Sequence, residues 1–117
     1  MLEHIEIQEK TRTRPSSPTP SEIQLMIATR CGVAVDELLG KGGGARVMFA
    51  RQTTMYLMHV VYGFSLTEIA ASFGRNRATA SEACHRIEDL RDDARFDRHL
   101  TELEELLRSA GENGVRP

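Results

Sequence analysis

The sequence predicts an all-α fold, a small helical bundle with a helix-turn-helix near its centre. Its 117 residues suffice for about one domain, and a hydrophobic share of 40% allows one modest core. Aromatic residues make up only 5% of the chain and Trp is absent, so leucine, alanine and methionine must fill the interior. β-branched residues never alternate with polar ones over the length of a strand, whereas apolar residues recur at helical spacing.

Residues 1–20 are predicted to be a disordered N-terminal arm. Three prolines fall within residues 15–20, and each removes a backbone N–H that a repeating hydrogen-bond pattern needs. The arm contains Lys10, Arg12 and Arg14. We interpret these side chains as charges of a solvated linker, with phosphate contact as the alternative.

The helical domain is predicted to span residues 21–110. Ser21 is a candidate N-cap of the first helix, with Glu22 in its first turn, and Gly32 ends it. A short helix over residues 35–39 follows. The glycines around Lys41 do not form the GxxxxGK pattern, followed by Ser or Thr, of a phosphate-binding loop. They therefore predict a hinge and no nucleotide site.

A long helix is predicted over residues 46–62. Apolar side chains cover so wide an arc of this helix that it must lie at the centre of the core. Its polar exceptions are Arg51, Gln52 and His59. We interpret its methionines as packing residues and not as ligands; they are Met48, Met55 and Met58.

The next two helices form the predicted helix-turn-helix. Ser65 as N-cap and Glu68 three residues later complete a capping box, and Phe64 and Ile69 have the spacing of a hydrophobic staple. The corner at residues 74–76 separates this helix from a second one that Asn76 caps. The inward stripe of the second helix is Ala80, Ala83, Cys84, Ile87 and Leu90.

The beginning of the second helix is the candidate DNA-binding site. In a helix-turn-helix this end enters the major groove of double-stranded DNA. Arg77 can form two hydrogen bonds to guanine, and Thr79 can reach a phosphate or a thymine methyl group. Ala78, Ser81 and Glu82 are also predicted to face away from the core. The competing interpretation is a helix pair of an ordinary bundle that does not bind DNA.

The last predicted helix spans residues 94–110, and residues 111–117 are predicted to be a disordered tail. An apolar stripe follows one side of this helix, with acidic residues on the other. We expect the stripe to pack on the core, and a homodimer seam across a two-fold axis is the alternative. The stripe consists of Phe96, Leu100, Leu103, Leu106 and Leu107.

The charge is distributed unevenly along the chain. The formal net charge is −2, but residues 41–91 contain seven lysines and arginines against four aspartates and glutamates. This mildly basic centre is compatible with a DNA partner.

The sequence predicts no metal site, no cofactor and no enzymatic activity. Cys31 and Cys84 lack CxxC or Cys/His ligand spacing, and we interpret them as reduced residues in or near the core. The four histidines have no catalytic or metal-binding partners at a recurring spacing. A leader peptide and a membrane-spanning apolar stretch are not apparent, which favours a cytoplasmic protein.

Four segments together resemble a known family: DELLGK at 36–41, ARQTTMYL at 50–57, SLTEIAASFG at 65–74 and ACHRI at 83–87. The family is the C-terminal, DnaA-box-binding domain of the bacterial replication initiator DnaA, a TrpR-like helical bundle. The likeness covers residues 21–108 and includes no part of the family's ATPase domain. In this family a basic loop reaches the minor groove, an Arg-Gln pair holds the DNA backbone, and the second motif helix reads the major groove. The matching positions here are Lys41, Arg51, Gln52, Arg75 and Thr79.

Several departures from the family's pattern fall on the expected DNA-facing surface. Glycines replace the basic residues after Lys41, so Arg46 is the nearest remaining charge in that loop. The second helix has one glycine fewer before it than the family pattern GGRDHTTVLH. The changed positions there are Asn76, Arg77, Ala78 and Glu82.

Two functions are therefore compatible with the sequence. The first is a double-stranded DNA-binding regulator of replication initiation or transcription, with its own or a relaxed sequence preference. The alternative is a degenerate protein-interaction module that has lost DNA-box binding and acts on a replication or transcription protein. The candidate DNA contacts are Lys41, Arg46, Arg51, Gln52, Arg75, Asn76, Arg77, Thr79, Ser81 and Glu82.

Overall fold

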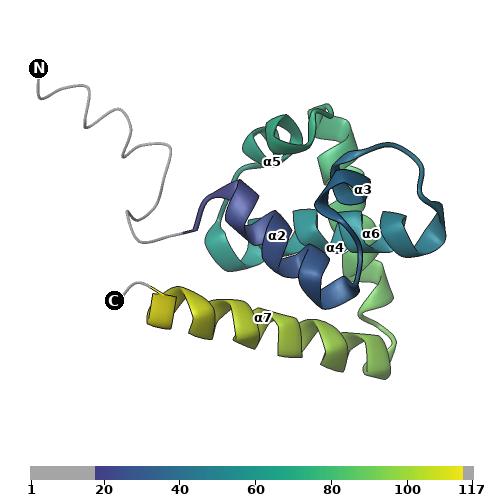
Figure 1. Cartoon of the computed structure of the whole chain (residues 1–117). Helices are drawn as coiled ribbons and strands as arrows, with labels where there is room; N and C mark the ends of the chain where they lie inside the picture. The colour runs from purple at the N-terminus through teal and green to yellow at the C-terminus, as the bar shows by residue number, and fades with distance from the viewer. Residues whose placement is uncertain (1–17, 115–117) are drawn as a thin grey trace, which may run out of the picture.

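A computed structural model describes residues 18–114 of the chain, with side-chain surroundings for residues 18–109. Residues 1–17 of the predicted arm over residues 1–20, and residues 115–117 of the predicted tail, lie outside this range. The described part of the chain forms an all-α bundle without strands (Figure 1). Its helices are α2 (Pro20–Cys31), α3 (Val35–Leu39), α4 (Gly44–Tyr62), α5 (Leu66–Phe73), α6 (Arg77–Leu90) and α7 (Ala94–Gly114).

The first described helix begins earlier than the sequence predicted. The predicted N-cap, Ser21, is wrong, because Thr19 is the N-cap of α2. The Thr19 hydroxyl accepts a hydrogen bond from the Glu22 backbone N–H over 3.2 Å, and the Glu22 carboxylate accepts one from the Thr19 N–H over 2.8 Å. Pro20 occupies the first helical position, where a missing N–H removes no helical hydrogen bond.

The core is built around α4, which packs against each of the other five described helices. Its side chains Met55, Leu57 and Met58 are at most 1% exposed, as expected for packing residues. Met48 is the exception, at 47% exposed. The predicted central helix is thus confirmed, although it begins at Gly44, two residues before the expected start.

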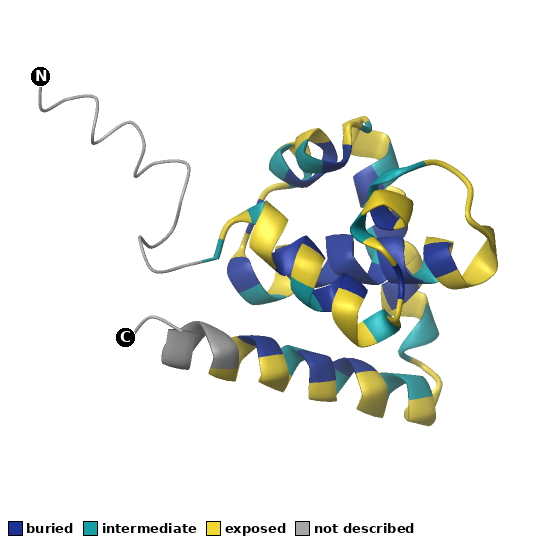
Figure 2. Ribbon diagram, viewed as in Figure 1, coloured by how far each residue is buried: buried dark blue, intermediate teal, exposed yellow. Residues whose placement is uncertain are grey.

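The last helix, α7, lies along one side of the bundle and packs on α4 (Figure 1). Phe96 near its start stacks edge to face on Phe49 with 5.2 Å between ring centroids, and the Leu107 carbonyl accepts a hydrogen bond from the Tyr62 hydroxyl over 3.1 Å. The buried side of α7 faces the other helices (Figure 2). Within its predicted stripe Leu106 is 37% exposed, so packing on the core accounts for most of the apolar surface.

The end of α7 also differs from the prediction. The helix continues to Gly114, four residues beyond the expected end at residue 110. The prediction ended the helix before Gly111. A glycine within a helix costs about 1 kcal/mol relative to alanine, which weakens a helix but does not have to end it.

Three further features of the described residues concern membrane-spanning helices, metal-binding groups and cysteine thiols. None of the described helices has the length and apolarity needed to cross a membrane. The residues described include no group of three or more His, Cys, Asp or Glu side chains suited to a metal ion. Cys31 and Cys84 are half-buried free thiols, and burial raises the pKa of Cys31.

Candidate DNA-binding surface

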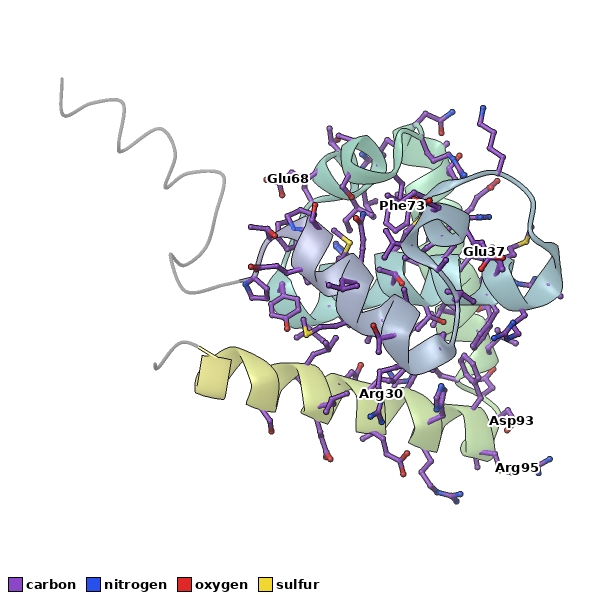
Figure 3. The ribbon with its side chains drawn as sticks, in the orientation of Figure 1. Arg30, Glu37, Glu68, Phe73, Asp93 and Arg95 are labelled. Carbon is purple, nitrogen blue, oxygen red and sulfur yellow. The ribbon has the colours of Figure 1, made fainter. Side chains whose placement is uncertain are left out.

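The first helix of the predicted helix-turn-helix, α5, begins and ends where the sequence indicated. The Ser65 hydroxyl accepts a hydrogen bond from the Glu68 N–H over 3.0 Å, and the Glu68 carboxylate accepts one from the Ser65 N–H over 2.9 Å. Gly74 ends the helix with a φ of 66°, a left-handed conformation that glycine adopts without strain. Glu68 lies near the start of α5 and Phe73 at its end, where the Phe73 side chain is buried (Figure 3).

The second helix, α6, begins with a side-chain cap. The Asn76 amide oxygen accepts hydrogen bonds from the Thr79 backbone N–H over 2.9 Å and from the Thr79 hydroxyl over 3.0 Å. Asn76 is exposed and Thr79 is half-buried. Both predicted contact residues therefore already have a local structural role, because they stabilise the first turn of α6.

Two charged side chains project from the first turns of α6 into solvent. Arg77 and Glu82 are exposed, and neither forms a side-chain hydrogen bond or ion pair with another described residue. Ser81 lies between them and is half-buried. The start of α6 therefore presents one guanidinium and one carboxylate without partners among the described residues, about one and a half helical turns apart.

Arg51 faces the interior instead of the solvent. Arg51 is one of the buried polar or charged residues of the described chain and is only 4% exposed. Its Nε donates a hydrogen bond to the Leu38 carbonyl over 2.7 Å, and its Nη2 donates to the carbonyls of Glu37 at 2.8 Å and Gly42 at 3.1 Å. Burial, and then the positive charge of Arg75, lowers the pKa of Arg51. Arg51 thus joins α4 to α3 and to the glycine-rich loop, residues 40–43.

Two more of the predicted DNA contacts also bind backbone carbonyls. Arg75, in the turn between α5 and α6, donates a hydrogen bond from Nη2 to the Gly40 carbonyl. Arg46 donates from Nη2 to the Gly32 carbonyl over 2.6 Å and to the Cys31 carbonyl over 3.4 Å, at the end of α2. Arg75 is half-buried, whereas Arg46 remains exposed.

The remaining candidates lie in and beside the loop. Lys41 is exposed and forms no side-chain hydrogen bond or ion pair within the described part of the chain. Gln52 is half-buried on α4, next to Arg51 in the chain. The contact between Arg75 and Gly40 brings the residue that precedes Lys41 to the turn that precedes α6. Lys41 and Arg77, 36 positions apart in the sequence, therefore belong to neighbouring segments.

Sequence reasoning missed the internal role of these arginines. The partners of Arg46, Arg51 and Arg75 are carbonyl oxygens, and every residue has one, so no motif marks them. Sequence reasoning also did not single out Arg86, an exposed residue of α6. Arg86 lines a shallow hollow on the outer side of α6 together with Glu82, His85, Asp89 and Leu90.

Comparison with known protein families identifies the helix-turn-helix formed by α5 and α6. Residues 20–87 match the family described as the bacterial dnaA protein helix-turn-helix. The chain belongs to this DnaA family. The match covers α2 to most of α6, so it includes the whole helix-turn-helix and the glycine-rich loop. The resemblance that the sequence motifs indicated is confirmed, as is the all-α bundle with a central helix-turn-helix.

Individual DnaA proteins show the same likeness. The chromosomal replication initiator protein DnaA of Oenococcus oeni is 32% identical over 91 residues, which cover 77% of this chain and 19% of that protein. DnaA of Thermus thermophilus is 35% identical over 92 residues, or 78% of this chain and 20% of that protein. The chain thus spans about a fifth of the length of the curated relatives it matches, and the match lies in a non-catalytic domain.

Proposed function

We propose that this protein binds double-stranded DNA through its helix-turn-helix, with the start of α6 in the major groove. The observation that supports this most directly is Arg77, a guanidinium at the first position of α6 that is exposed and without a partner among the described residues. Arginine in this position can form two hydrogen bonds to guanine. The DnaA helix-turn-helix, to which the chain belongs, is a DNA-binding domain in DnaA.

The proposed contacts are fewer than the sequence suggested. Lys41 and Arg77 are free to meet phosphates or bases, with Thr79 and Ser81 beside them at the start of α6. Arg51 and Arg75 donate to carbonyls of the loop, so we assign them to its support. With fewer contacts to phosphates we expect a lower affinity, and with fewer contacts to bases a relaxed sequence preference. We further propose a regulatory role in replication initiation or transcription, in the cytoplasm.

Fluorescence anisotropy with a labelled duplex, over a salt series, tests DNA binding. If Lys41 and Arg77 each neutralise one phosphate, the logarithm of the binding constant falls with the logarithm of salt concentration at a slope of about −2. Arg77→Ala is expected to weaken binding by about 1–3 kcal/mol. Arg95→Ala, an exposed arginine on α7 rather than on the helix-turn-helix, is the matched control and leaves the affinity unchanged. Absent or salt-independent binding of the wild-type protein refutes the proposal.

The alternative function, a protein-interaction module, also has specific observations in its favour. The loop offers only Lys41 as a free cation, and Glu82 places a negative charge where phosphates would approach. Such a module would bind a replication or transcription protein, or a second copy of this chain. A stable complex with a purified DnaA initiator, combined with no salt-dependent binding of duplex DNA, would favour this alternative.

Self-association is tested separately. The apolar stripe of α7 is largely buried against the bundle, and Leu106 is its one clearly exposed side chain within the described range. A dimer through α7 would therefore have to extend from Leu106. Sedimentation of the wild-type protein and of Leu106→Glu distinguishes a monomer from such a dimer, since a charge at the seam would dissociate it.

A further inference from the structure

We propose that Arg75 is a positioning residue for DNA binding, which acts through Lys41 by holding the glycine-rich loop against the start of the helix-turn-helix. This inference rests on the DNA-binding function proposed above. It assigns Arg75 a different role from the direct DNA contact that the family resemblance implies.

The first support is the pair of bonds on either side of Lys41. Arg75 donates a hydrogen bond to the carbonyl of Gly40, the residue before Lys41. Arg51 donates to the carbonyl of Gly42, the residue after it, over 3.1 Å. The peptide unit directly before Lys41 is therefore held from the turn before α6, and the unit that begins at the Gly42 carbonyl is held from α4.

The second support is that the loop has few other contacts to hold it. Gly42, Gly43 and Gly44 have φ values of 77°, 97° and 80°, in the left-handed region. A Cβ added at Gly42 would meet no atom within 4 Å, whereas one added at Gly43 would meet the Val47 side chain of α4 at 2.8 Å, so the loop approaches α4 at Gly43 and stands clear of the helices at Gly42. Glycine loses more conformational entropy on ordering than any other residue. Besides the approach of Gly43 to Val47 and the hydrogen bond from the Gly40 N–H to the Glu37 carbonyl over 3.2 Å, the arginine–carbonyl bonds are the interactions that restrain the loop.

The third support is the position of Arg75 in the chain. It directly precedes the N-cap Asn76 and lies two residues before Arg77. Its bond to Gly40 thus fixes the loop relative to the same helix start that presents Arg77. If the bond is lost, we expect Lys41 to sample many positions and to pay a larger entropic cost when it binds a phosphate.

A double-mutant cycle separates positioning from direct contact. The affinity of the full chain for a mixed-sequence duplex is measured for the wild type, Lys41→Ala, Arg75→Ala and the double variant. We expect each single substitution to weaken binding about three- to tenfold, and Arg75→Ala to change the affinity less than about twofold when Lys41 is already alanine. The salt slope should fall by about one in each single variant and no further in the double variant.

A matched cycle uses Arg77, whose side chain forms no hydrogen bond or ion pair with residues 18–109. Arg77→Ala and Lys41→Ala should be additive, because both side chains contact DNA independently. Equal losses from Arg75→Ala in the presence and absence of Lys41 would overturn the inference and indicate that Arg75 touches DNA itself. A wild-type protein that does not bind the duplex would instead refute the proposed function, so the two failures are distinguishable.

Arg75→Ala could also lower the affinity by unfolding the protein. A measurement on the backbone of the loop distinguishes this from a loss of positioning. Backbone ¹⁵N order parameters are measured for Lys41 and Gly42 in the wild type, in Arg75→Lys and in Arg75→Ala. The order parameters of both residues should be lower in Arg75→Ala, while those of core residues such as Leu57 stay unchanged. Arg75→Lys, which retains a donor, should give intermediate values. Unchanged order parameters at Lys41 and Gly42 in Arg75→Ala overturn the inference.

Discussion

Arg91 donates a hydrogen bond to the Glu104 carboxylate over 2.7 Å, which joins the residue after α6 to the middle of α7. The same guanidinium donates to Asp97 at 2.6 Å, to the Thr101 hydroxyl at 3.0 Å and to the Tyr56 hydroxyl of α4 at 3.0 Å. Burial by itself lowers the pKa of Arg91, but the hydrogen bonds to Glu104, Asp97 and Tyr56 outweigh it and raise that pKa. Arg91 thus fixes α7 to the central helix as a permanent cation.

Replacing Arg91 should therefore destabilise the fold. Arg91→Ala is expected to lower the free energy of unfolding by about 2–3 kcal/mol, because Glu104, 16% exposed, loses its cation. Arg91→Lys keeps the positive charge but lacks the planar guanidinium, so its free energy of unfolding should lie between those of the wild type and Arg91→Ala. Urea denaturation followed by circular dichroism measures these values. Arg95→Ala, an exposed arginine in the first turn of α7 (Figure 3), is the control and should change stability by less than about 0.5 kcal/mol. Equal stability of the two alanine variants would contradict the prediction.

Features set by neighbours in the chain could be predicted from the sequence. The caps of α5 and α6 are examples, since Ser65 with Glu68 and Asn76 with Thr79 are each three residues apart. The start of α2 was mispredicted because two local solutions compete. Ser21 also has a capping-box partner three residues on, Gln24. In the structure the Gln24 amide is buried and donates to the Ser72 carbonyl of α5 over 3.2 Å. The Gln24 side chain is therefore bound to a residue 48 positions away and does not complete a capping box with Ser21.

The candidate site was less predictable for the same reason. The free side chains Arg77 and Glu82 could be assigned from their place on the outer side of α6. Arg46, Arg51 and Arg75 have the same residue type as a DNA contact, but they donate to the carbonyls of Gly32, Leu38 and Gly40, which lie between 13 and 35 residues away in the sequence. Only the arrangement of the helices in space shows which arginine is occupied.

The loop support by Arg51 leads to a second prediction. Arg51→Lys should lower the free energy of unfolding by about 2 kcal/mol, because an ammonium group cannot replace a guanidinium that serves the carbonyls of Leu38, Glu37 and Gly42 together. Thermal and urea unfolding measure the difference. Gln52→Ala, at the half-buried neighbouring position, is the comparison and should cost less than about 1 kcal/mol. A fully stable Arg51→Lys would show that the charge alone supports the loop.

Burial of Cys84 produces a pH dependence at alkaline pH. Burial, and then the negative charge of Glu88, raises the pKa of the Cys84 thiol from 9.0 to about 11. The unfolded chain therefore releases this proton first, and the folded state loses stability as the pH rises from about 9 to about 11, with no effect below about 9. The thiolate absorbance of Cys31→Ser should titrate near pH 11 when folded. Stability curves of Cys31→Ser and the Cys31→Ser, Cys84→Ser double variant should diverge in this interval. Parallel curves would contradict the prediction.

Glu82 gives a prediction that depends on the proposed function. Its exposed carboxylate lies on the second turn of α6 without a partner among the described residues. Because it would repel phosphates, Glu82→Gln is expected to raise the affinity for a mixed-sequence duplex about three- to tenfold at low salt, and less at high salt. Asp89→Asn, also exposed but about 10 Å further along α6, is the control and should have a smaller effect, since salt screens charges over that distance. Equal gains from both variants would contradict a DNA contact at the start of α6. A loss of affinity confined to duplexes with one particular cytosine would indicate instead that Glu82 accepts a hydrogen bond from its amino group.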